Sequence, residues 1–92
     1  MMSFEDKVYS ACKKIPKGKV STYSAIAMAI GHPNAQRAVG NTLNKNRSKE
    51  VPCHRVVRSD GKVGGFVHGS ARKIDLLVSE GVSIKNGKLS TE

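Results

Sequence analysis

Two short helical segments with a tight connection between them constrain the fold of this 92-residue chain most strongly. Residues 22–31 carry apolar side chains at helical spacing, begin at a hydroxyl residue that can serve as N-cap (Ser21 or Thr22) and end at a glycine. A His-Pro-Asn turn follows, and Asn34 is placed to cap a second helix over residues 35–44. Two short helices joined by three or four residues are typical of a helix-turn-helix.

The flanking segments predict a small, mainly helical domain with minor strands. Before the helix pair, Ser3 and Asp6 resemble a capping box, and the helix that they begin carries Cys12 on its apolar stripe, so we expect Cys12 to be a core residue. After the pair come a short strand at Val56-Val57, a turn over residues 59–62, a helix capped by Ser70 with Ala71, Ile74, Leu77 and Val78 inward, and a hairpin at Asn86-Gly87. We therefore expect one domain over residues 1–92, mainly α with small β elements, and winged-helix-like.

The charge balance points to an anionic partner. Sixteen Lys and Arg residues against seven Asp and Glu residues give a formal net charge of +9. Nine of the basic residues lie between Arg37 and Lys73, where the acidic residues are Glu50 and Asp60. An excess of this size predicts attraction to a polyanion, most often nucleic acid. The alternative is a basic protein without such a partner.

The N-terminal stretch and the hydropathy indicate where the protein works. The first ten residues are acidic and amphipathic rather than basic and then apolar, so we expect no secretory signal. No apolar run approaches the ~18 residues that a transmembrane helix needs. We expect a cytoplasmic monomer that does not associate with membranes.

The helix predicted over residues 35–44 has one face suited to reading DNA. Its apolar stripe is Ala35, Ala38, Val39, Thr42 and Leu43, and the opposite face carries Arg37, Gly40, Asn41 and Asn44. A glycine inside a helix costs ~1 kcal/mol relative to alanine, so Gly40 needs a reason. A face of small residues lets the helix backbone approach another surface closely, and Arg37 can project from it into a groove. The alternative is a weak surface helix in which the glycine is neutral.

Cys53 stands in the run Val51-Pro52-Cys53-His54-Arg55 and admits three interpretations. A zinc site would need four Cys or His ligands, commonly in close pairs, and the isolated cysteines do not offer them, so we expect no metal and no cofactor. A buried structural cysteine is the ordinary case. A nucleophile is the third: Pro52 can present Cys53 at a turn, and nearby His54 and basic residues raise the thiolate fraction.

Five segments in order resemble one protein family along nearly the whole chain. They are "IPKGKVSTYSAIA", "AQRAVGNTLNKN", "VPCHRVV", "GKVGGF" and "LLVSEG". They resemble the DNA-binding domain of the O6-alkylguanine-DNA alkyltransferases. The resemblance implies that a guanine flips out of duplex DNA and that its O6-alkyl group moves onto a cysteine that is not regenerated. It implies a single-turnover methylated-DNA–protein-cysteine methyltransferase whose partner is duplex DNA containing O6-alkylguanine.

The resemblance also assigns roles within the site. It implies Cys53 as the alkyl acceptor, His54 as a water-mediated base and Glu80 as the residue that orients the histidine. Asn46 matches the asparagine that organises the turn between the recognition helix and the active site. Lys73 matches a pocket lysine, and we place it in the substrate pocket.

Further matches concern the DNA and the rest of the pocket. Arg37 matches the arginine that fills the gap left by the flipped base. Tyr23 matches the tyrosine that helps to rotate the phosphate and donates a proton to guanine, although its spacing also suits a core residue. Val51 and Pro52 complete the predicted pocket with Phe66, which stands where many members carry tyrosine, so a hydrogen bond to the substrate is in question there.

Two alternatives to transfer stay open. Members of the family usually carry an N-terminal domain before this one, and stand-alone domains are typical of alkyltransferase-like proteins, which sense lesions for excision repair. Those sensors replace the cysteine with tryptophan or alanine, whereas this chain keeps Cys53. The other alternative is a transcription regulator that uses the helix-turn-helix without the cysteine.

Overall fold

The computed structural model describes residues 2–46, 48, 50–66 and 69–90. Its elements in chain order are α1 (Phe4–Lys13), β1 (Ser21–Thr22), α2 (Tyr23–Ala29), α3 (Gln36–Asn44), the 3-10 turn η1 (Cys53–Arg55), β2 (Val56–Val57), α4 (Ser70–Ser79), β3 (Ile84–Lys85) and β4 (Lys88–Leu89). The expected mainly helical domain with small β elements is confirmed. None of the described helices is long and apolar enough to span a membrane.

The helix starts follow local side-chain chemistry. Ser3 accepts a hydrogen bond from the backbone N–H of Asp6 at 3.1 Å, and the Asp6 carboxylate accepts one from the backbone N–H of Ser3 at 3.3 Å, which completes the predicted capping box of α1. Thr22 caps α2 by accepting from the N–H of Ala25 at 3.0 Å. These caps fix the beginnings of two of the three helices in the N-terminal half.

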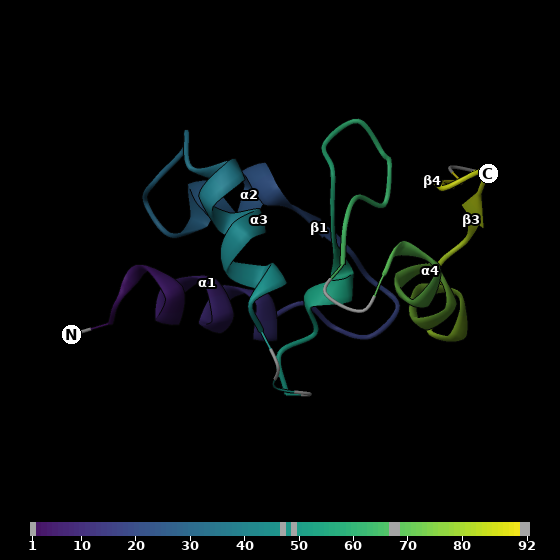
Figure 1. The fold of residues 1–92 in the computed structure, drawn as a ribbon, viewed down its shortest axis with the longest axis horizontal. Coiled ribbons are helices and arrows are strands. Elements are labelled where there is room, and N and C mark those ends of the chain that lie inside the picture. Colours follow the sequence, from purple (N-terminus) through teal and green to yellow (C-terminus); the bar gives the residue numbers. More distant parts are fainter. Residues whose placement is uncertain (1, 47, 49, 67–68, 91–92) are drawn as a thin grey trace.

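Two short strand pairs connect the parts of the molecule. β1 and β2 are parallel, with Ser21 opposite Val56 and Thr22 opposite Val57, so the segment that leads into α2 lies beside the segment that leaves η1. β3 and β4 form the predicted hairpin, in which Asn86 and Gly87 both have positive φ, as a two-residue type I′ turn requires. In Figure 1, α1, α2 and α3 pack together at the N-terminal end, while α4 and the hairpin lie at the other end.

The core has two parts. The larger lies among α1, α2 and α3 and extends to Cys53 and Val56; its buried members are Val8, Cys12, Ile15, Ile26, Ala27, Val39, Leu43, Val51, Cys53 and Val56. The smaller joins Val57, Val63 and Leu77 beneath α4. Because Val56 and Val57 are neighbours in β2 and belong to different clusters, β2 links the two parts.

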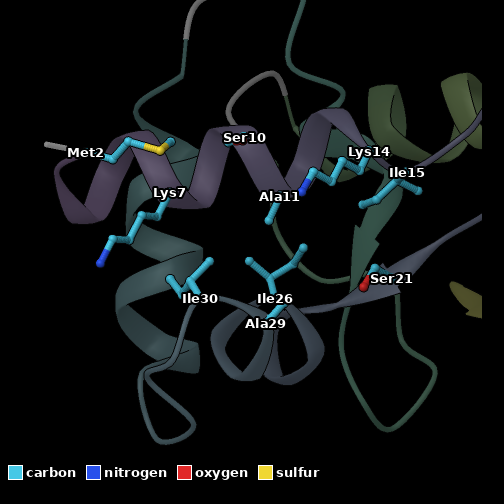
Figure 2. A pocket seen from close by; sticks show the side chains of 10 residues that line it. All are labelled: Met2, Lys7, Ser10, Ala11, Lys14, Ile15, Ser21, Ile26, Ala29 and Ile30. Atoms are coloured by element: carbon cyan, nitrogen blue, oxygen red, sulfur yellow. The ribbon is translucent and has the colours of Figure 1, made fainter.

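A groove lies between α1 and α2 on the larger core. Figure 2 shows Ile26 of α2 reaching into it, together with Ile15 and Ile30, which lie just beyond the ends of α1 and α2, and Lys7 and Lys14 at its edge. Ile15 and Ile26 are buried and form part of its floor. α1 therefore covers α2 incompletely.

Several predicted helix details are wrong. α3 has Ala35 as its N-cap, with no side-chain capping bond, because the chain enters through a backbone hydrogen bond from Ala35 to the carbonyl of His32 at 2.9 Å. Asn34 is therefore not the cap. α3 also turns Ala38 to solvent and buries Val39, Thr42 and Leu43.

α4 differs in the same way. Gly69, at φ +92°, is its N-cap, so Ser70 lies inside the helix and its hydroxyl donates to the carbonyl of Gly64 at 3.3 Å. Leu77 is buried and Ile74 packs against the smaller cluster, as predicted, but the same face also buries Lys73, four residues before Leu77. Val78 is 53% exposed and Ala71 is exposed, because the helix is rotated to bury the lysine.

Candidate active site and basic groove

A proline turn presents Cys53. Pro52 has φ −79° and ψ +66°, and the N–H of Cys53 donates to the carbonyl of Val51 at 2.8 Å, which is an inverse γ-turn centred on the proline. The proline ring favours this φ, so the predicted turn has a local cause. η1 then begins at Cys53, whose exposed fraction is 6%, and Val51 is also buried.

Asn46 reaches the sulfur of Cys53 from the segment that follows α3. Its Nδ2 donates to Cys53 Sγ at 3.0 Å, and the same nitrogen lies 3.0 Å from the Ser48 carbonyl and 3.3 Å from the Val51 carbonyl. Its Oδ1 accepts from the N–H of Ser48 at 3.0 Å, which fixes the amide orientation. Asn46 therefore both shapes the turn and contacts the Cys53 sulfur.

Hydrogen bonds lower the pKa of the Cys53 thiol. The largest cause is a hydrogen bond with the thiol of Cys12, burial opposes it, and the Asn46 amide and a backbone N–H add to it. Lys73 adds a smaller favourable charge. The surroundings of Cys53 thus raise the fraction of thiolate, the nucleophilic form, above that of a free cysteine.

His54, Arg55 and Glu80 form a charged cluster beside the turn. His54 Nε2 lies 3.0 Å from Glu80 Oε1, the pairing that the sequence predicted. Arg55 donates to both carboxylate oxygens of Glu80, from Nε at 2.9 Å and from Nη2 at 2.6 Å, and its Nη1 donates to the Ile15 carbonyl at 2.8 Å. The pKa of Glu80 is lowered, chiefly by Arg55, so its carboxylate stays ionised.

The role of Arg55 as the anchor of Glu80 was missed by the sequence reasoning. Arg55 appeared there as one more nearby cation. The bidentate geometry needs α4 to pack against η1, which residue order alone does not reveal. Its adjacency to His54 in the sequence was the one available signal.

Lys73 is fully buried and joins the site to Tyr23. Its Nζ donates to the Tyr23 hydroxyl oxygen at 3.2 Å and to the Gly65 carbonyl at 3.1 Å, and it lies 5.5 Å from the centre of the tyrosine ring. Burial lowers the pKa of Lys73 to about 8. Phe66 lies edge-on to the His54 ring, with 6.4 Å between ring centres. Tyr23 is thus more than the plain core residue that its spacing also allowed.

A separate open groove of about 550 Å³ runs between the helix pair and the loop after β2. Its lining residues are Tyr23, Ser24, Gln36, Arg37, Gly40, Asn41, Asn44, Arg58, Ser59, Gly64 and Gly65. The face predicted from the sequence therefore forms one wall, and Arg58 on the opposite loop adds a cation that was not singled out. Gly64 has φ +76°, and a Cβ there would lie 3.2 Å from the Tyr23 hydroxyl, so the glycine permits the loop to close on Tyr23.

The predicted residues thus fall into two adjoining groups. Arg37, Gly40 and Asn41 line the groove, whereas Val51, Pro52 and Cys53 lie in the turn, outside the groove lining. Tyr23 lines the groove and accepts a hydrogen bond from Lys73, whose charge acts on Cys53. Among the described residues, no three His, Cys, Asp or Glu side chains gather in a way that could hold a metal ion.

Comparison with known proteins supplies the family. Residues 3–82 match the model of the 6-O-methylguanine DNA methyltransferase family, DNA binding domain. The methylated-DNA–protein-cysteine methyltransferase of Methanosarcina acetivorans is 46% identical over 79 residues, which are 85% of this chain and 51% of that protein. The chain spans between 27% and 51% of the length of the first such relatives.

Solved structures agree with the fold. The structure of S. pombe Atl1 in complex with damaged DNA containing O6-carboxymethylguanine is 38% identical, with a TM-score of 0.87, and the match covers 98% of this chain and 93% of that one. The structure of Mycobacterium tuberculosis OGT in complex with DNA is 40% identical, with a TM-score of 0.83, and the match covers 88% of this chain and 50% of that one. The expected helix-turn-helix class is confirmed by these neighbours.

Proposed function

The chain belongs to the 6-O-methylguanine DNA methyltransferase family, and from this premise we propose that it repairs DNA by accepting one alkyl group from O6-alkylguanine onto Cys53. The observation that carries the proposal is the hydrogen-bonded sulfur of Cys53, with Asn46 at 3.0 Å and a lowered thiol pKa. A cysteine that only filled the core would need neither. Residues 1–92 act as one DNA-binding and acceptor domain in this proposal.

Duplex DNA binds along the basic groove. Arg37 enters the space left when the damaged guanine leaves the stack, and Gly40 and Asn41 allow the α3 backbone to approach the DNA. Arg58 contacts phosphate from the opposite loop. The two sides of the groove come from separate parts of the chain, so binding depends on the loop that Gly64 closes against Tyr23.

Transfer is a displacement at the alkyl carbon. The Cys53 thiolate attacks that carbon, a sulfur–carbon bond forms, and the bond between the carbon and guanine O6 breaks. The electron pair stays with the guanine, which takes up a proton from the Tyr23 hydroxyl and becomes ordinary guanine. Lys73, 3.2 Å from that hydroxyl, stabilises the charge left on the tyrosine oxygen. The thioether has no route back to a thiol, so each molecule reacts once.

The charged cluster prepares the thiolate. Glu80, held by Arg55, orients His54 through Nε2, which leaves Nδ1 for a water that takes the Cys53 proton. Val51 and Phe66 form apolar walls near the turn, and Pro52 sets its direction. These assignments follow the motif matches and the distances together.

A second function is a lesion sensor that binds alkylated guanine and recruits excision-repair proteins without transfer. The observation that favours it is the match to Atl1, which this chain covers almost end to end. In that case the polar surroundings of Cys53 would have no consequence for DNA. The two functions differ in whether the protein gains mass.

The test is mass spectrometry after incubation with duplex DNA that contains O6-methylguanine. We expect one added methyl group per molecule, located on the peptide containing Cys53 and absent from Cys12. Cys53→Ala should bind the same duplex and gain nothing. Tight binding by the wild-type protein with no mass gain after long incubation would establish the sensor instead.

A further inference from the structure

The chain's two cysteines lie together in the core. Cys12 belongs to the last turn of α1 and is fully buried. Its Sγ donates to the carbonyl of Pro52, the residue before Cys53, at 3.3 Å, and both cysteines belong to the larger buried cluster. Hydrogen bonding between the two thiols is also the largest cause of the shift in the pKa of each. The sequence predicted Cys12 as a core residue, which is confirmed, but its spacing did not reveal that it contacts the acceptor cysteine.

A thiol at this place does something that an aliphatic side chain cannot. Valine or leucine would fill the same space, whereas a thiol also carries one proton that it can donate. That proton has two acceptors within reach, the Pro52 carbonyl and the Cys53 sulfur. A charged acceptor forms the stronger hydrogen bond, so the proton should turn from the carbonyl to the sulfur when Cys53 ionises.

Cys12 remains the donor and does not compete for the negative charge. The hydrogen bond with Cys53 raises the pKa of the Cys12 thiol, and burial raises it further. In the part of the chain that the structure describes, the titratable groups that interact electrostatically with the two thiols are Tyr9 from α1, Tyr23 from α2, Arg55 from η1 and Lys73 from α4. The two tyrosines stay neutral at pH 7, because burial raises the pKa of each.

We propose that Cys12 is a positioning residue of the acceptor site, whose thiol donates a hydrogen bond to the Cys53 thiolate and holds it in the reactive form. The thiolate then has two side-chain donors on different elements, Cys12 of α1 and Asn46 after α3. The role rests on the proposed function only in that Cys53 is the acceptor. It predicts a property of the sulfur that can be measured without DNA.

The experiment measures the rate at which Cys53 reacts with iodoacetamide as a function of pH, with the site assigned by peptide mass spectrometry. Three variants separate the causes: Cys12→Ser keeps a donor, Cys12→Ala removes it, and Cys12→Val removes it while filling the space. We expect serine to keep the wild-type profile. Alanine and valine should shift the profile to higher pH and lower the rate at pH 7 by about tenfold, since a hydrogen bond to a charged group contributes at least ~1.5 kcal/mol.

Two outcomes would overturn the inference. If the alanine and valine variants fold, as circular dichroism can check, and keep the wild-type profile, Cys12 is a core residue and nothing more. If serine shifts the profile as far as valine, the donor is not the cause. If the wild-type protein shows the low thiol pKa but takes no alkyl group from DNA, the role of Cys12 stands and the acceptor function is refuted. The two failures are therefore distinguishable.

Discussion

Gly40 offers a test in which stability and DNA binding should change in opposite directions. It lies inside α3, where a glycine costs ~0.8–1.0 kcal/mol relative to alanine. A Cβ at this position would lie 3.7 and 3.8 Å from two carbons of the Tyr23 ring, which is ordinary van der Waals contact, so alanine fits without strain. Gly40→Ala should therefore stabilise the free protein by about 1 kcal/mol and raise Tm by about 4–8 °C in a domain of this size.

The same methyl group should weaken DNA binding. It would stand in the groove beside Tyr23, where the proposal brings the duplex backbone close to α3. We expect a several-fold higher Kd for a duplex containing O6-methylguanine, measured by fluorescence anisotropy. Thermal unfolding followed by circular dichroism gives the stability on the same sample.

Ala38 provides the matched control two residues away. It lies on α3, is exposed and is outside the groove lining. Ala38→Gly should lower the stability by about 1 kcal/mol and leave the Kd unchanged. If Gly40→Ala is stabilised yet binds DNA as tightly as the wild type, close approach is not the reason for the glycine. If it is destabilised, the reading of its contact with Tyr23 is wrong.

Four further predictions concern charge. The affinity for duplex DNA should fall as salt is added, and the logarithm of the binding constant should change with the logarithm of the salt concentration with a slope of roughly −4 to −5 for about five phosphate contacts. Binding that does not depend on salt would contradict the groove assignment. Arg37→Ala should weaken binding without changing Tm. Lys73→Met should remove a pH dependence of the unfolding free energy. In the folded protein the pKa of Lys73 is about 8, below its ordinary 10.5, so between these two pH values the unfolded chain binds more protons than the folded protein. The unfolding free energy of the wild type should therefore increase as the pH rises from 8 to 10.5. Denaturant titrations between pH 8 and 10.5 give the unfolding free energy at each pH. If it rises with pH as steeply in the variant as in the wild type, Lys73 is not the group responsible. Glu80→Gln should slow transfer and shift its pH profile upward, because a neutral amide orients His54 less firmly; an identical pH profile would make Glu80 purely structural.

The features predicted best from the sequence are helix caps and turns, which depend on residues close together in the chain. The Ser3–Asp6 capping box, the Thr22 cap and the Asn86-Gly87 turn depend on residues a few positions apart, and all three are present. Ser70 was misplaced by one position, because Gly69 can adopt the positive φ that ends the preceding loop.

The site was predicted only in part, because its contacts are long-range. The motif placed His54 with Glu80, but the clamp of Arg55 on that carboxylate depends on how α4 packs. Lys73 lies at a position where periodicity leads one to expect an apolar residue, and its burial depends on Tyr23 accepting its hydrogen bond. No local pattern could join Cys12 to Cys53.

The parallel pairing of β1 with β2 has a consequence for the order of folding. Ser21 pairs with Val56, so the chain between them must be closed into a loop before the ladder can form. Such non-local contacts form late in folding, because the chain loses conformational entropy on closing the loop before the contacts can stabilise it. During refolding, Cys53 should therefore behave as an ordinary thiol until α1, η1 and α4 have come together. Pulse labelling with a thiol reagent during refolding would then show when Cys53 becomes reactive. That time should coincide with completion of the fold.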